Sequence, residues 1–129
     1  MKKITAALFA ALLLLACKPA QPPVSTGLPR TDTSFVIAFG SCNKTELTNP
    51  FWDDILALDP DLWIWGGDNI YADTPDMGKM RAMYQAQKQV PGYRSLAEST
   101  PVIGTWDDHD YGLNDGGSDF AARAESQQA

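Results

Sequence analysis

Three short apolar runs, each followed by a polar loop, constrain the fold of this chain more than any other feature. The runs occupy residues 34–39, 62–65 and 101–106, and apolar residues recur at helical spacing between them. Short apolar runs bounded by turn residues are typical of buried strands. Connections long enough to contain a helix allow neighbouring strands to pair in parallel. The pattern therefore predicts an α/β fold in β-α-β-α-β-α order with a mainly parallel sheet.

Capping residues set the expected starts of the helices. Asn49, followed by proline, is suited to cap a first helix, and Asp76 is suited to cap a second. A proline–glycine pair ends the second helix, and a short helix to about Ser99 follows it. A last helix is expected to start near Asp119.

Polar and metal-ligating side chains follow all three apolar runs. In open α/β sheets, ligands bind beyond the carboxyl ends of the strands, so these groups are expected to converge at one edge. The window 104–119 holds five aspartates and no lysine or arginine. Such a convergence is unfavourable unless a cation compensates it, which predicts a metal site with mixed hard and soft ligands. The groups are Ser41, Cys42 and Asn43 after the first run, Asp68, Asn69 and Tyr71 after the second, and Asp107, Asp108, His109 and Asp110 after the third.

Each of these groups taken alone has a structural alternative. Asp68 follows two glycines and is also typical of a simple turn, and residues 107–110 are also typical of a solvated acidic loop. Tyr71 alone favours a packed aromatic, and Cys42 alone favours a buried, inert thiol. The combination is more specific for a metal site than any of its parts.

Length and charge exclude several classes of protein. The 129 residues suffice for one modest core, with a net charge of −6. Without the two lysines of the leader described next, 8 basic residues face 16 acidic ones, a net charge of −8. This balance argues against a nucleic-acid-binding module. The acidic residues are 13 aspartates and 3 glutamates, and aspartate favours turns and hard cations.

The N-terminus is typical of an export signal. Residues 1–16 combine a basic start with an apolar stretch that is short for a membrane span of roughly 20 residues. The segment Leu14-Leu15-Ala16-Cys17 resembles a bacterial lipobox, which implies a lipoprotein signal peptide and a lipid on Cys17. The alternative is an ordinary secretory signal. Residues 17–33 are rich in proline and are expected to be a tether. The expected location is the bacterial cell envelope, on the periplasmic side or at the outer membrane.

Three motifs carry a resemblance to a known enzyme family. They are Gly-Ser-Cys-Asn at 40–43, Gly-Gly-Asp-Asn-Ile-Tyr at 66–71 and Thr-Trp-Asp-Asp-His-Asp-Tyr-Gly-Leu-Asn-Asp at 105–115. In order and spacing the segment 34–129 resembles the PhoD-like alkaline phosphatases and phosphodiesterases of the calcineurin-like metallophosphatase superfamily. The resemblance implies a partial metallophosphatase-type α/β sandwich. It also implies hydrolysis of extracytoplasmic phosphomonoesters or phosphodiesters with iron and calcium.

The resemblance implies a set of metal ligands. Cys42 and Tyr71 correspond to an iron-ligating cysteine and tyrosinate, and Asp68 corresponds to the carboxylate that bridges the two metals. Asp108 corresponds to a ligand of the second metal, and Asn114 is expected on the calcium side.

The same resemblance implies roles around the ligands. His109 is expected to be the catalytic group, poised near the phosphate to stabilise the transition state or to protonate the leaving alkoxide. Asp107 and Asp110 are expected to orient the loop behind the metal ligands.

The chain differs from the family in length. Members are typically several hundred residues long and have further metal-binding motifs in their C-terminal half, whereas no histidine follows His109. Residues 34–129 are therefore expected to be the N-terminal part of such a domain, incomplete and poorly active alone. The alternative is a truncated, catalytically inactive lipoprotein fragment that at most binds metal or phosphate weakly.

Overall fold

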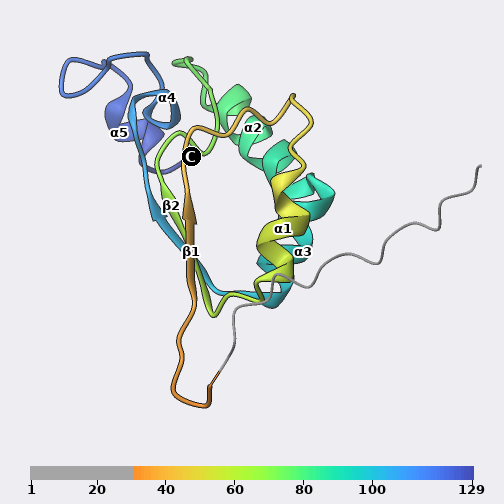
Figure 1. Ribbon diagram of the computed structural model, residues 1–129. Coiled ribbons are helices and arrows are strands. Elements are labelled where there is room, and N and C mark those ends of the chain that lie inside the picture. The colour runs from red at the N-terminus through yellow and green to blue at the C-terminus, as the bar shows by residue number, and fades with distance from the viewer. Residues whose placement is uncertain (1–30) are drawn as a thin grey trace, which may run out of the picture.

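The sheet has three strands, all parallel, in the order β1-β2-β3. The structure is a computed structural model that describes residues 31–129 (Figure 1). The strands are β1 (Ile37–Gly40), β2 (Leu62–Gly66) and β3 (Val102–Thr105). Ile37 lies opposite Leu62, and Trp63 lies opposite Val102. The predicted α/β class and the parallel sheet are confirmed. β1 and β3 are shorter than the apolar runs that predicted them.

Three helices cover one face of the sheet, and two short helices follow β3 (Figure 1). The covering helices are α1 (Phe51–Ala57), α2 (Met77–Gln89) and α3 (Pro91–Ser99); the short ones are α4 (Asp108–Tyr111) and α5 (Arg123–Ser126).

The helix starts agree in part with the capping residues. Asp76 caps α2 as predicted, because its Oδ1 accepts hydrogen bonds from the N–H groups of Gly78 and Lys79 at 2.8 and 3.2 Å. The predicted start of the last helix is wrong by four residues. Asp119 instead accepts a hydrogen bond from the N–H of Gly117, which closes a turn before α5.

An aromatic cluster joins the helical layer to the sheet. Trp52 of α1 lies edge-on to Trp63 and Trp65 of β2, with ring centroids 5.6 and 5.9 Å apart. The indole N–H of Trp65 donates to the hydroxyl of Tyr93 in α3 at 3.1 Å. A Cβ at Gly92 would lie 2.4 Å from that of Trp52, so this close approach requires glycine. Aromatic pairs of this kind contribute about 0.5–1.5 kcal/mol each beyond burial.

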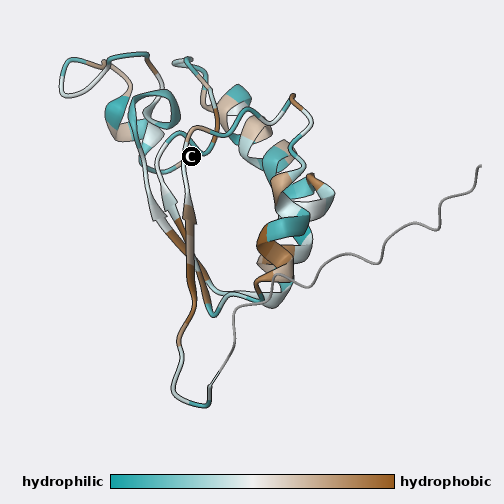
Figure 2. Cartoon of the chain, in the orientation of Figure 1, coloured by the Kyte–Doolittle hydropathy of each residue, from teal (hydrophilic) through white to brown (hydrophobic). Residues whose placement is uncertain are grey.

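The other face of the sheet is apolar and exposed. Phe35, Ile37 and Phe39 alternate along β1 and its approach, and they are 66%, 51% and 80% exposed. Ile103 of β3 is also exposed. Figure 2 shows the hydrophobic colouring along the strands. No described residues cover this face.

The leader lies outside the described residues. This applies to the predicted signal peptide, to the lipidation site Cys17 and to most of the tether. Among residues 31–129, no helix combines the length and the apolar character that a membrane span requires.

Candidate metal centre

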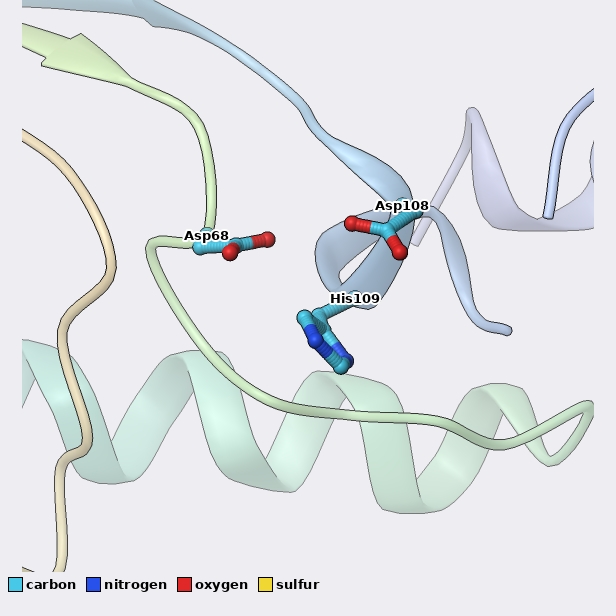
Figure 3. A group of neighbouring side chains, drawn as sticks. All are labelled: Asp68, Asp108 and His109. Carbon is cyan, nitrogen blue, oxygen red and sulfur yellow. The ribbon is translucent and has the colours of Figure 1, made fainter. Parts of the chain in front are cut away.

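Asp68, Asp108 and His109 meet at the carboxyl end of the sheet. Asp68 follows β2, and Asp108 and His109 form the start of α4, just after β3. One ligand atom from each residue lies within 4.8 Å of the other two (Figure 3). Two carboxylates and an imidazole at this separation could hold a metal ion.

Asp68 is the member of this group whose buried charge lacks compensation by neighbouring groups. The residue is only 7% exposed, and its Oδ1 is buried without a hydrogen-bond partner. Its backbone has a φ of 49°, which is uncommon for residues other than glycine. A buried carboxylate oxygen without a partner is unfavourable unless a proton or a cation compensates it. The geometry of Asp68 therefore favours a cation beside Oδ1.

Cys42 approaches Asp68 through its other carboxylate oxygen. The thiol donates to Asp68 Oδ2 with a sulfur–oxygen distance of 3.6 Å. Backbone hydrogen bonds from Cys42 to Gly67 and from Asn43 to Asp68 hold the two loops together at 3.2 and 2.9 Å. Cys42 is exposed, so the alternative of a buried core cysteine is wrong.

The Asp108-His109 segment is helical because Asp107 and Asp110 form a capping box. The carboxylate of Asp107 accepts from the N–H of Asp108 at 3.0 Å, and Asp110 Oδ2 accepts from the N–H of Asp107 at 3.1 Å. Asp110 Oδ1 also accepts from the N–H of Ile70 at 3.0 Å, which links α4 to the loop after β2. Asp110 is almost fully buried, and this burial raises its pKa. These bonds fit the predicted orienting role of both aspartates, which stays a prediction.

We expect Asp110→Ala to lower the free energy of unfolding by about 2–5 kcal/mol, because it leaves the N–H groups of Ile70 and Asp107 without an acceptor. Urea unfolding of the metal-free chain measures this change. The matched control is Asp54→Ala at an exposed position of α1, where a change of less than about 1 kcal/mol is expected. Equal effects of the two substitutions would show that Asp110 does not hold the loops together.

His109 is held by a residue that the sequence analysis missed. Its Nδ1 lies 2.8 and 2.9 Å from the two carboxylate oxygens of Asp73. This hydrogen bond, together with the negative charges of Asp73, Asp108 and Asp68, raises the pKa of His109 in the metal-free chain. Partial burial acts in the opposite direction. A carboxylate on Nδ1 fixes the orientation of the ring and leaves Nε2 for a ligand or a substrate.

Asp73→Asn is expected to lower the pKa of His109 in the metal-free chain. Because the folded pKa is raised, the stability that this pair contributes is fully present below pH of about 6.5 and is lost as the pH rises through the folded pKa. His109 is the only histidine, so its imidazole NMR signals give the titration without assignment. Asp54→Asn should leave the curve unchanged. An unchanged curve in Asp73→Asn would disprove the pairing.

Tyr71 borders the group, whereas Asn114 is linked to it only through its neighbour Asp115. The ring of Tyr71 lies 4.2 Å from the ring of His109, measured between centroids. Burial and the charge of Asp68 raise the pKa of Tyr71 to about 12, so a tyrosinate there would require a cation. Asn114 is exposed, and its amide donates to the carboxylate of Asp115 at 2.7 Å.

Asp108 receives a hydrogen bond from the segment that contains Asn114. The backbone N–H of Asp115 donates to Asp108 Oδ2, and this bond lowers the pKa of Asp108. Asn114 is therefore connected to Asp108 through its neighbour Asp115.

The sequence and the structure were also compared with known proteins. No protein-family model, curated protein or solved structure matches the chain.

Proposed function

We propose that this chain is a metal-dependent phosphoric ester hydrolase of the PhoD-like type, acting on phosphomonoesters or phosphodiesters in the bacterial cell envelope, with a lipid anchor on Cys17. The observation that carries the proposal is the group of Asp68, Asp108 and His109, with its buried, unpartnered carboxylate oxygen. The resemblance of the three sequence motifs supports the same reaction.

The donor set fits the two metals that the resemblance implies. The thiol of Cys42 contacts Asp68, and the ring of Tyr71 contacts that of His109. Thiolate and phenolate ligands suit ferric iron. The carboxylate of Asp108 offers the oxygen ligands that calcium prefers. Iron and calcium are therefore the proposed cofactors; Cys42 and Tyr71 would hold the first and Asp108 the second, and Asp68 could contribute to both.

The protein groups have separate proposed tasks. Bound cations would neutralise the phosphate and supply an activated water. Asp68 accepts a hydrogen bond from Cys42 through one carboxylate oxygen, and its other, unpartnered oxygen is the proposed metal ligand. His109, oriented by Asp73, is the proposed proton donor to the leaving alkoxide. Asp107 and Asp110 keep α4 in the position that places both Asp108 and His109.

Metal titration and ester hydrolysis together test this function. Calorimetric titration of the full chain with iron and with calcium should show saturable binding. Hydrolysis of p-nitrophenyl phosphate and of bis(p-nitrophenyl) phosphate at alkaline pH should be slow, should require both metals and should stop with a chelator. If neither metal binds, the proposal is wrong.

A second candidate function is weak metal or phosphate binding without turnover. The observation in its favour is the small number of ligands, because the group offers three ligand atoms among the described residues, whereas calcium alone takes about six to eight oxygens. Saturable metal binding without hydrolysis of either ester would favour this catalytically inactive fragment over the enzyme.

A further inference from the structure

A groove of about 490 Å³ lies beside the candidate metal centre, along β1 and α1. The buried indoles of Trp52, Trp63 and Trp65, which are 3–6% exposed, form its floor. Leu47 and Phe51 also line it, although they are 62% and 64% exposed. Large apolar side chains that are exposed together around a concavity are typical of a ligand-binding surface.

The groove is continuous with the metal centre through two residues. Cys42 lines the groove, and its sulfur lies 3.6 Å from Asp68 Oδ2. Lys44 also lines the groove, and its Nζ lies 5.1 Å from the centroid of the Tyr71 ring. Since the Tyr71 ring packs on His109, the ammonium group stands where the groove meets the metal centre.

The charges at this junction are suited to a ligand that has an anionic end and an apolar end. The metal centre is built from carboxylates, and Lys44 brings a positive charge to the end of an otherwise uncharged groove. A phosphate at the metal centre would lie near this ammonium, and the group esterified to the phosphate would extend along the exposed side chains of Leu47 and Phe51, above the indole floor. Aromatic rings pack on an exposed phenylalanine ring such as that of Phe51, and other apolar groups bury surface against it and Leu47.

We propose that the groove binds the alcohol portion of the substrate, and that the substrates are phosphate esters of aromatic or other large apolar alcohols. The assignment of the phosphate end rests on the proposed function. The assignment of the groove rests on its own lining, so the two are testable separately.

The experiment is an NMR titration of the metal-free full chain with 1-naphthyl phosphate, 1-naphthol and inorganic phosphate. The chain has four tryptophans, of which three line the groove, and Trp106 lies elsewhere. The two naphthyl compounds should shift three of the four indole N–H signals in a saturable way. The signal of Trp106 is an internal control, and inorganic phosphate should leave the three groove signals in place.

Two variants with a matched control complete the test. Phe51→Ala and Leu47→Ala should each weaken 1-naphthol binding about tenfold, because each removes apolar contact surface from the groove. Phe35→Ala, at an equally exposed phenylalanine outside the groove, should leave binding unchanged. Far-UV circular dichroism confirms that the variants fold.

Three results would overturn the proposal: equal shifts of all four indoles, unchanged affinity in both groove variants, or no saturable shift with either naphthyl compound. Because the titration contains no metal, these results are distinct from a failure of metal-dependent hydrolysis. In the calcium-loaded chain, where the carboxylates are compensated, tighter binding of 1-naphthyl phosphate than of 1-naphthol, with the difference reduced in Lys44→Met, would place the phosphate at the junction. Equal or weaker binding of the phosphate ester in the calcium-loaded chain would overturn that part of the assignment.

Discussion

Asp68→Asn is expected to weaken metal binding by more than about 100-fold, since even residues that only support metal ligands contribute about 10–100-fold. Metal-dependent ester hydrolysis should be abolished with it. The physical reason is that Asp68 supplies the buried charge of the group, through an oxygen that has no other partner. Calorimetric metal titration measures the first effect, and hydrolysis of p-nitrophenyl phosphate measures the second.

The stability of the metal-free variant separates loss of the site from loss of the fold. Removing an uncompensated buried charge should leave the melting temperature of metal-free Asp68→Asn equal to that of the parent or above it. Asp54→Asn, the same substitution on the exposed side of α1, should leave binding and melting unchanged. Undiminished metal affinity in Asp68→Asn would contradict the proposed centre.

His109→Ala is expected to reduce turnover by about 10²–10⁴-fold, the usual contribution of a general acid. Metal affinity should fall far less than turnover, because a group that only transfers a proton makes no bond to the metal. Steady-state hydrolysis and metal titration of the same sample measure the two effects. Asp73→Asn should reduce turnover in the same direction but less, because it releases the ring without removing it.

Added imidazole provides the sharper control. It should partly restore turnover in His109→Ala, where it can occupy the space of the missing ring, and should fail to do so in His109→Gln, where the side chain fills that space. A ring nitrogen of His109 also lies within 4.8 Å of a carboxylate oxygen of Asp68 and of Asp108, close enough for all three to bind one cation. Loss of bound metal in both variants would therefore make His109 a metal ligand and would end its assignment as the proton donor.

Local patterns predicted the sheet well, because each strand is a short apolar run followed by turn residues. The N-terminal cap of α2 was predictable for the same reason, since Asp76 bonds only to its immediate neighbours. α4 was not predicted as a helix. It is four residues long and holds three polar residues and a tyrosine, so apolar periodicity cannot reveal it. Its capping box, Asp107 with Asp110, was the available signal.

The site residues that directly follow a strand could be predicted from the sequence. Asp68 and Asp108 both follow parallel strands, which places them at one edge of the sheet. Asp73 could not be found in this way, because it lies outside the three loop motifs and meets His109 across 36 residues. The groove was equally hidden, since Leu47 and Trp65 line one concavity only when the segment around α1 packs on the sheet.

The parallel pairing also has a consequence for the order of folding. β1 and β2 pair residues 25 positions apart, such as Ile37 and Leu62, and β2 and β3 pair residues 39 positions apart, such as Trp63 and Val102. Because the chain must close two long loops to make these contacts, we expect the residues around Asp68 to come together after the folding transition state. A cation that binds only there would then contribute nothing to the transition state. Iron or calcium should therefore leave the refolding rate unchanged and slow the unfolding rate, so that bound metal lengthens the lifetime of the native chain without hastening its formation.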